Sequence, residues 1–164
     1  MQRLRARAYS MIIGIDCGYR TGGVALISPS DNWAEVHDLP VYDEGGVDVA
    51  ALMDLITSGN KVDHIYVERQ HAMPKQGVVS TFKIGFAFGQ ITSTCALSRS
   101  PYTIISANTW KRALGLAKDK DASRRLAQQW YPDVTSDLKR KKDEHRAEAL
   151  LIAHYGRKQH EYKT

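Results

Sequence analysis

Two acidic residues each stand at the end of a short apolar run. Asp16 closes the run MIIGID (11–16), and Glu68 follows the apolar residues of DHIYVER (63–69). Each run predicts a buried strand. If the two strands pair in parallel, their carboxyl ends lie side by side at about 4.8 Å. Two carboxylates at that spacing repel each other unless a cation lies between them, and Mg²⁺ or Mn²⁺ prefers such oxygens.

Each of these acids also has a plainer interpretation. Asp16 would simply start a turn, and Glu68 would pair with Arg69 or with a lysine. For either residue alone this interpretation is the stronger one. Taken together, the two residues favour a metal site at one edge of a sheet.

A third carboxylate is expected from the segment DEHRAEALLIAHY (143–155). Glu148 lies at the edge of an apolar helical face, where a charge is costly without a partner. His145 and Glu144 precede it by three and four residues, so either one shares its face. Asp143 is rotated away and suits a helix cap, although it would reach the site from the helix start. The alternative for Asp143 and Glu144 is an exposed, charged first turn.

The elements that must position these residues follow from hydrophobic periodicity and turn residues. The pattern predicts strands over 11–16, 22–28, 33–39, 63–69 and 101–106. It predicts helices over 47–58, 78–99, 119–130 and 143–155, with a short helix capped by Ser106 or Asn108 and ending at Leu114. No internal repeat or long linker divides the 164 residues, so we expect one domain.

Composition excludes several classes of protein. The chain is 43% hydrophobic and 25% charged, an ordinary globular mixture. Cys17 and Cys95 are too few for a disulfide framework or a cysteine-rich zinc site. No apolar run approaches the ~20 residues of a membrane span, and the basic residues 1–10 lack the apolar stretch of a signal peptide. We therefore expect a soluble protein of the cytoplasm.

Charge is distributed unevenly along the chain. Residues 11–68 hold ten acids against two bases, whereas residues 69–164 hold 18 bases against eight acids. This asymmetry indicates a polyanion that contacts one face of the protein. The alternative is a solvated helix surface, and charge by itself does not decide between the two.

The motifs resemble the RuvC family of Holliday junction resolvases, within the RNase H-like nucleases, and most of all its phage and prophage branch. The matching segments cover most of residues 11–156: GIDCGYRTGGVAL (14–26), VERQHAMPKQGVVSTFKIGFAFGQI (67–91), SANTWKRALGL (106–116) with the following KDKDASRRLAQQWYP, and RAEALLIAHY (146–155). The strand-end Asp, the strand-end Glu with its loop, and the acid-bearing helix occur in the order of the family.

The resemblance implies an α/β fold, with a five-stranded mixed sheet of order 3-2-1-4-5 flanked by helices. The nuclease domain would span 11–157, between a basic extension (1–10) and a C-terminal tail (158–164). A homodimer would nick two opposed strands of a four-way junction in a bacterial or phage-infected cell, leaving 5′-phosphate and 3′-hydroxyl ends.

The resemblance also implies a catalytic and metal site formed by Asp16, Glu68, His145 and Glu148. Asp16 would bridge two Mg²⁺ ions about 3.5–4 Å apart, with Mn²⁺ able to substitute. Glu68 would bind one ion, and His145 with Glu148 the other. Glu148 stands where the family usually has an aspartate, and His145 where it has an acid or sometimes a histidine. Asp143 or Glu144 in place of His145 is left open.

Candidate DNA contacts lie in two groups. The loop 69–77 follows Glu68 directly and offers Arg69, Gln70, Lys75 and Gln76. Basic residues after the last predicted strand would contact phosphates: Lys111, Lys118 and Lys120. Phe82 would be a wedge against an opened base, although an aromatic in this helix is more often a core or dimer residue.

Three other functions compete with junction cleavage. An actin-like ATPase or sugar kinase has a similar strand–Asp–Gly hairpin, but it needs two such domains. Another RNase H-like nuclease, acting on RNA or on RNA–DNA hybrid, would share Asp16 and Glu68. A non-catalytic junction-binding protein would tolerate the departures at His145 and Glu148.

Overall fold

A single mixed sheet organises the chain in the computed structural model, which describes residues 10–58, 61–116 and 121–161. The strands are β1 (Ser10–Asp16), β2 (Gly23–Ile27), β3 (Ala34–Asp38), β4 (Lys61–Glu68) and β5 (Tyr102–Ile105), in the order β3-β2-β1-β4-β5. β2 pairs antiparallel with β1 and β3, whereas β4 pairs parallel with β1 and β5. The predicted sheet and its strand order are confirmed.

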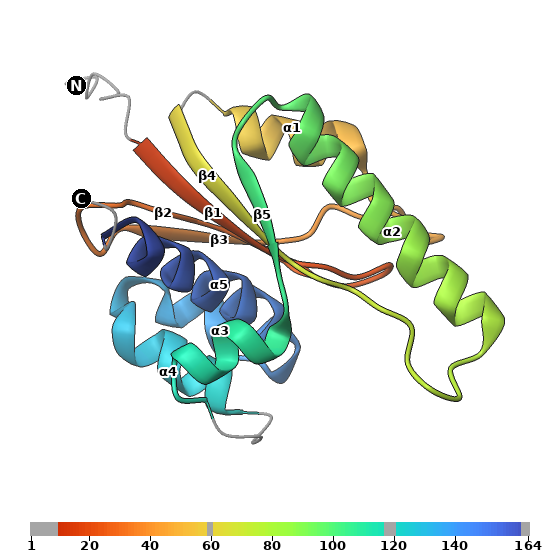
Figure 1. Ribbon diagram of the computed structural model, residues 1–164. Helices are drawn as coiled ribbons and strands as arrows, with labels where there is room; N and C mark the ends of the chain where they lie inside the picture. Colours follow the sequence, from red (N-terminus) through yellow and green to blue (C-terminus); the bar gives the residue numbers. More distant parts are fainter. Residues whose placement is uncertain (1–9, 59–60, 117–120, 162–164) are drawn as a thin grey trace.

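Helices cover both faces of this sheet (Figure 1). α1 (Val49–Thr57) and α2 (Val78–Leu97) lie on one face, and α3 (Ala107–Ala113), α4 (Ala122–Trp130) and α5 (Glu144–Glu161) lie on the other. Two hydrophobic cores result, because successive side chains of a strand point to opposite faces. Ile12 packs in the core under α5, whereas Ile13 and Ile15 pack in the core under α1 and α2.

α5 approaches the sheet closely at two glycines. A Cβ at Gly14 of β1 would collide with the carbonyl oxygen of Ala149 and the amide nitrogen of Ala153. A Cβ at Gly23 of β2 would collide with the carbonyl of His145. The missing side chains let the helix backbone rest directly on two strands, which fixes the height of its residues above the sheet edge.

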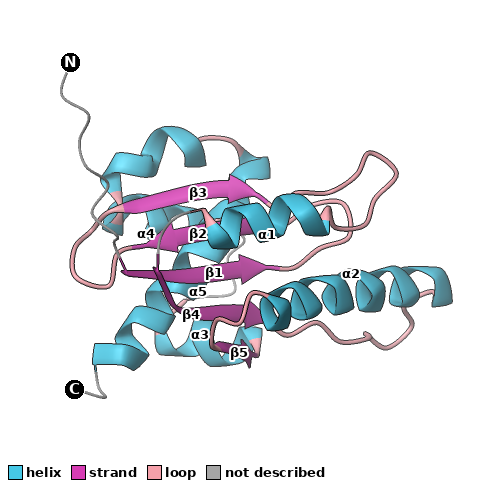
Figure 2. Cartoon of the chain, turned by 90° about the horizontal axis from the view of Figure 1, so that it is seen from above, coloured by secondary structure: helices cyan, strands magenta, loops and turns pink. Residues whose placement is uncertain are grey.

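The other long helix, α2, extends beyond the sheet. Its buried residues lie from its midpoint onward: Ala87, Ile91, Thr94 and Cys95. Its first half and the loop 69–77 project past the strand ends in both views (Figures 1 and 2). Val78, Phe82 and Phe86 in this half are 85%, 72% and 49% exposed.

The observed bounds agree with the predicted strands to within two residues, but the sequence prediction of the C-terminal helix was too short. The hydrophobic pattern predicts an end at 155, where the apolar residues stop. α5 instead continues to Glu161. Its last turns contact other elements: Gly156 lies against the ring of Tyr66, and Arg157 Nη1 donates to the Asp31 carbonyl oxygen at 2.7 Å.

Between α4 and α5 the chain forms two 3₁₀ helices that periodicity did not predict, η1 (Pro132–Leu138) and η2 (Lys141–Asp143). Ser106 caps α3, and its hydroxyl accepts from the amide of Thr109 at 3.1 Å. The helix expected over 119–130 is observed from Ala122; residues 117–120, 1–9 and 162–164 lie outside the described residues. Within the described residues no helix is long and apolar enough to cross a membrane.

Candidate metal centre

Three carboxylates meet at the carboxyl edge of the sheet. Asp16 ends β1, Glu68 ends the neighbouring parallel strand β4, and Glu148 comes from the second turn of α5. One oxygen of each lies within 4.8 Å of the others. Asp16 and Glu68 are only 4% and 9% exposed, so the cluster is largely shielded from water. The side-by-side placement of Asp16 and Glu68 is what the parallel pairing of the two strands predicts, and the role of the three acids as metal ligands stays a prediction.

Each carboxylate has a different polar partner. His145 Nδ1 lies 2.7 Å from Asp16 Oδ2, and the buried indole of Trp110 donates to Glu68 Oε2 at 2.8 Å. Lys111 Nζ donates to Glu148 Oε1 at 2.7 Å, and the Ser123 hydroxyl lies 3.4 Å from the same oxygen. His145 belongs to α5, Trp110 and Lys111 to α3, and Ser123 to α4. Side chains from three helices therefore hold the acids at the ends of two strands and on α5.

The electrostatics of the cluster favour bound positive charge. Burial, followed by the negative charge of Asp16, raises the pKa of Glu68 to about 7. Burial also raises the pKa of Asp16, although the hydrogen bond from His145 opposes the rise. Without further cations, part of this cluster therefore has to hold protons near neutral pH. A divalent ion would replace them, because it stabilises the ionised carboxylates.

The two basic neighbours respond to the acids. The hydrogen bond with Asp16 raises the pKa of His145, against the effect of burial. Burial lowers the pKa of Lys111, but the hydrogen bond and charge of Glu148 outweigh it and the net shift is upward. Sequence reasoning placed Lys111 among the DNA contacts; in the structure its ammonium group pairs with Glu148.

Asp143 and Glu144, the acidic alternatives to His145, do not belong to the carboxylate cluster. The Asp143 carboxylate accepts from the side chain and the backbone N–H of Arg140, at 2.8 and 2.7 Å. Arg140 lowers the pKa of Asp143, and this residue acts as a cap. Among the described residues the cluster of possible ligands holds neither Asp143 nor Glu144. His145 contacts Asp16 directly, and its role as a ligand stays a prediction.

Both cysteines of the chain are buried. The Cys17 thiol donates to the Glu68 carbonyl at 3.4 Å and is buried beneath the ends of β1 and β4. Burial, then the charges of Asp16 and Glu68, raises the pKa of Cys17 well above its usual range. Cys95 on α2 is fully buried, which raises its pKa to about 12. Neither cysteine forms a disulfide.

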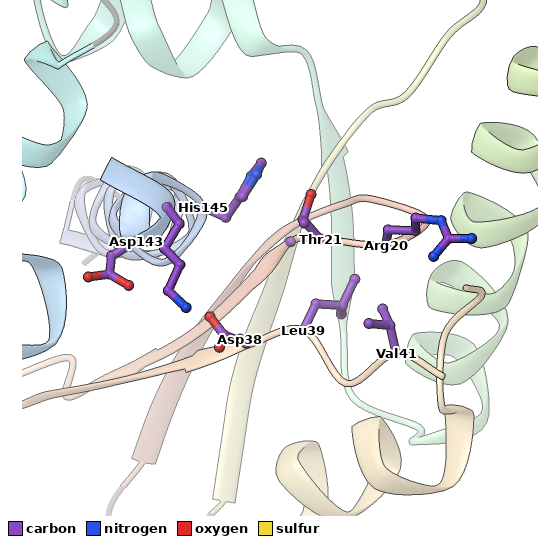
Figure 3. A pocket seen from close by; sticks show the side chains of 9 residues that line it. Arg20, Thr21, Asp38, Leu39, Val41, Asp143 and His145 are labelled. Atoms are coloured by element: carbon purple, nitrogen blue, oxygen red, sulfur yellow. The ribbon is translucent and has the colours of Figure 1, made fainter. Parts of the chain in front are cut away.

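A hollow of about 270 Å³ opens beside His145 (Figure 3). It lies between the start of α5 and the turns that carry Thr21 and Leu39. The basic side chains of Arg20 and Lys142 line it, and both of its acids are paired: Asp38 with Arg146 at 2.6 Å and Asp143 with Arg140 at 2.8 Å. The hollow therefore continues the site toward β3 without adding an unpaired carboxylate.

The predicted DNA-contact residues are partly described. Arg69 and Lys75 are exposed in the loop after Glu68, while Gln70 and Gln76 are half-buried, with Gln76 Oε1 accepting from the Met73 amide at 3.0 Å. Lys118 and Lys120 lie outside the described residues. Phe82 points away from the core and stacks on Phe86, with ring centroids 6.2 Å apart.

Sequence reasoning missed Trp110. The signal was available in part, since a buried indole N–H usually finds an acceptor. Nothing in the spacing of Trp110 indicated that the acceptor would be Glu68, because the two residues lie 42 positions apart.

Comparison with solved structures identifies the fold. Thermus thermophilus RuvC in complex with a Holliday junction substrate aligns with a TM-score of 0.72 at 17% identity, over 95% of this chain and 98% of that one. The yeast mitochondrial Holliday junction resolvase Ydc2 aligns with a TM-score of 0.59 at 13% identity, over 96% and 85%. The fowlpox virus Holliday junction resolvase aligns with a TM-score of 0.55 at 15% identity, over 94% and 99%.

No protein-family model and no curated protein matches the chain. At these identities the structural likeness establishes the fold, which is that of RuvC and other Holliday junction resolvases. The predicted resemblance is confirmed at that level, and its phage branch stays a prediction.

Proposed function

We propose that this chain is a metal-dependent endonuclease that nicks four-way and other branched DNA junctions. The observation that carries the proposal is the convergence of Asp16, Glu68 and Glu148 on one buried point of a resolvase fold. The solved complex of Thermus thermophilus RuvC with a Holliday junction substrate supports the choice of DNA. We assign the activity to one domain, residues 11–157, acting in the cytoplasm of a bacterial or phage-infected cell.

The residues fit a divalent cation. Their donor atoms are carboxylate oxygens, which suit a hard ion such as Mg²⁺, with Mn²⁺ as a substitute. The raised pKa values of Asp16 and Glu68 indicate a deficit of positive charge that a cation would fill. Asp16, Glu68 and Glu148 would hold two ions with His145, and the ions would activate water and stabilise the leaving 3′ oxygen.

The protein residues prepare this site by positioning its carboxylates. His145 holds one oxygen of Asp16 by a hydrogen bond, which restricts rotation of that carboxylate. Lys111 neutralises part of the charge of Glu148 until DNA arrives, and its half-exposed ammonium group is then within the site to contact a phosphate. The products would carry 5′-phosphate and 3′-hydroxyl ends.

The loop 69–77 would guide the DNA strand to the carboxylates. It leaves β4 directly at Glu68 and projects beyond the sheet, and it carries Arg69, Gln70, Lys75 and Gln76 along the chain between Glu68 and the start of α2. Lys118 and Lys120 would add phosphate contacts. Such contacts position DNA without reading its bases.

A homodimer would match the two equivalent scissile strands of a four-way junction. The exposed apolar residues of α2 support this assembly, because so large an uncovered apolar surface is uncommon on a monomer. They are Val78, Val79, Phe82 and Phe86.

The test is a panel of substrates incubated with Mg²⁺, Mn²⁺ or chelator: a four-way junction, a matched linear duplex and an RNA–DNA hybrid. We expect paired nicks in the junction alone, and none in chelator. Preferential cleavage of the hybrid would assign another RNase H-like activity. Junction binding without cleavage under every metal condition would assign a non-catalytic junction-binding protein.

A further inference from the structure

The indole of Trp110 is fixed in the core and aimed at Glu68. Its side chain is fully buried and packs with residues of α4, α5 and the strands. The Nε1–H donates to Glu68 Oε2 at 2.8 Å. Because the indole can only donate, this bond selects a carboxylate oxygen as its partner.

The neighbouring residue acts on a different acid. Lys111 Nζ lies 2.7 Å from Glu148 Oε1 and 5.0 Å from the centroid of the Trp110 ring. The two consecutive residues of α3 therefore hold one oxygen of Glu68 and one oxygen of Glu148. The Lys111 contact places positive charge inside the cluster, whereas the Trp110 contact is neutral.

We propose that Trp110 is a positioning residue that holds Glu68 Oε2 so that the carboxylate presents its other oxygen toward Asp16 and Glu148 to bind a divalent cation. The inference rests on the proposed metal site. Three observations support it: the indole is immobilised by packing, the hydrogen bond is short, and the bonded carboxylate belongs to the cluster of possible ligands.

A purely structural role would give a different dependence on metal. If the indole merely found an acceptor in the core, losing its N–H would lower stability without changing cation affinity. If it positions Glu68, losing the N–H frees the carboxylate to rotate and weakens cation binding. Loss of such an outer partner typically costs 10–100-fold in metal affinity or activity.

The first experiment is calorimetric titration of Mn²⁺ into wild-type protein, Trp110→Phe and Trp130→Phe. Phenylalanine keeps an aromatic ring at position 110 and removes the N–H. Trp130 is the matched control, because it packs against the same core and its ring contacts His154, not the carboxylates. We expect Mn²⁺ affinity to fall roughly 10-fold or more in Trp110→Phe and to stay within twofold in Trp130→Phe.

The second experiment requires no variant at position 110 to fold. The three tryptophans give three indole N–H cross-peaks in a ¹H–¹⁵N NMR spectrum, and Trp33→Phe and Trp130→Phe assign that of Trp110 by elimination. We expect the Trp110 cross-peak to move on Mg²⁺ addition, and to move in metal-free Glu68→Ala, while the other two stay in place.

The outcomes separate this inference from the proposed function. Wild-type affinity in Trp110→Phe, or a Trp110 cross-peak unaffected by Mg²⁺, would overturn the positioning role even if the protein cleaves junctions. Both effects in a protein that cleaves no junction would support the positioning role and overturn the proposed reaction. Absence of Mn²⁺ binding by the wild-type protein would overturn both.

Discussion

The two long helices of this fold use the sheet in opposite ways. α5 lies on β1 and β2 along its length and buries eight of its residues, including Ala147, Ala149 and Leu150. α2 is two residues longer but buries four, from its midpoint at Ala87 onward. One helix brings Glu148 and His145 to the strand ends; the other carries apolar side chains away from the sheet.

The difference assigns rigid support of the carboxylates to α5 and recognition of a partner to the first half of α2. A ligand cluster requires positions fixed to within a fraction of an ångström, and a helix resting on strand backbone at Gly14 and Gly23 provides them. An exposed helix end lacks that support and instead offers surface to a partner. Changes near α5 should therefore alter chemistry and stability, and changes on the first half of α2 should alter assembly.

The largest effect is expected at the strand ends. Asp16→Asn should lower junction cleavage by several orders of magnitude while junction binding is retained, because it removes charge from the cation site and keeps the shape. Glu148→Gln should lose nearly as much. Nicking assays under single-turnover conditions and gel-shift titrations measure the two quantities.

A specific pattern would contradict the assignment of Glu148. If Glu148→Gln cleaves normally while Asp143→Asn or Glu144→Gln is inactive, the ligand comes from the start of α5 and the helix register of the proposed site is wrong. Asp54→Asn, at an exposed acid of α1 outside the carboxylate cluster, serves as a folded control with the same chemical change.

The next effect concerns assembly through α2. Light scattering at micromolar concentration should give about twice the 18.4 kDa chain mass. Phe86→Asp should give the mass of one chain with little change in melting temperature, because Phe86 is already half-exposed. Trp33→Asp changes an exposed aromatic residue that lies outside α2, and it should leave the dimer intact. A monomeric wild-type protein would contradict this use of α2.

The third effect is a pH dependence of folding stability that arises from Glu68, at the carboxyl edge of the sheet. The folded-state pKa of Glu68 is about 7, against 4.5 for the ordinary group, so the folded protein binds this proton more tightly than the unfolded chain. Stability from this group is fully present below pH 4.5 and is lost as the pH rises to about 7. The loss is at most about 1.4 kcal/mol per pH unit for one proton.

The comparison with Glu68→Gln isolates this contribution. Burial lowers the pKa of His154 to about 4, and that group changes stability in the opposite direction over part of the same range. Urea unfolding in chelator should show Glu68→Gln gaining stability relative to wild type from pH 5 to pH 7. A difference independent of pH would show that Glu68 is not the group responsible.

The smallest effects are expected at two glycines, one in the strand under α5 and one within α2. Gly14→Ala should destabilise the fold by about 1–3 kcal/mol, because its Cβ meets the backbone of α5. A Cβ at Gly85 on α2 would meet no atom within 4 Å. Gly85→Ala should therefore stabilise the fold by about 0.5–1 kcal/mol, because alanine has the higher helix propensity. Denaturant unfolding measures both, and a destabilising Gly85→Ala would show that a partner covers that face.

The sheet and three of its site residues followed from sequence because local signals coincide with the fold. A buried strand reads as an apolar run, and a parallel pair brings the acids that end the two runs together, as for Asp16 and Glu68. Glu148 rests on helical spacing and on the family resemblance. Its distance from the strand ends depends on Gly14 and Gly23, whose close packing no local pattern reveals.

The contacts of α3 were beyond sequence reasoning for a similar reason. Trp110 and Lys111 reach Glu68 and Glu148 across 42 and 37 positions, through the packing of α3 against the core. Residues 132–143 carry no helical or strand period, and they form 3₁₀ turns held by contacts such as Arg140 to Asp143. Long-range packing determines the contacts of α3, whereas local side-chain contacts that leave no hydrophobic period hold the 3₁₀ turns.

The burial of both thiols makes the chain suited to site-directed labelling. Thiol reagents react with the thiolate, and the raised pKa values of Cys17 and Cys95 keep both thiols protonated and out of reach. A single cysteine introduced at Ser93, an exposed residue of α2 outside the apolar dimer surface, would then be the reactive thiol of each chain without removal of the native pair. Spin labels at that position would report the distance between two copies of α2 in an otherwise natural sequence.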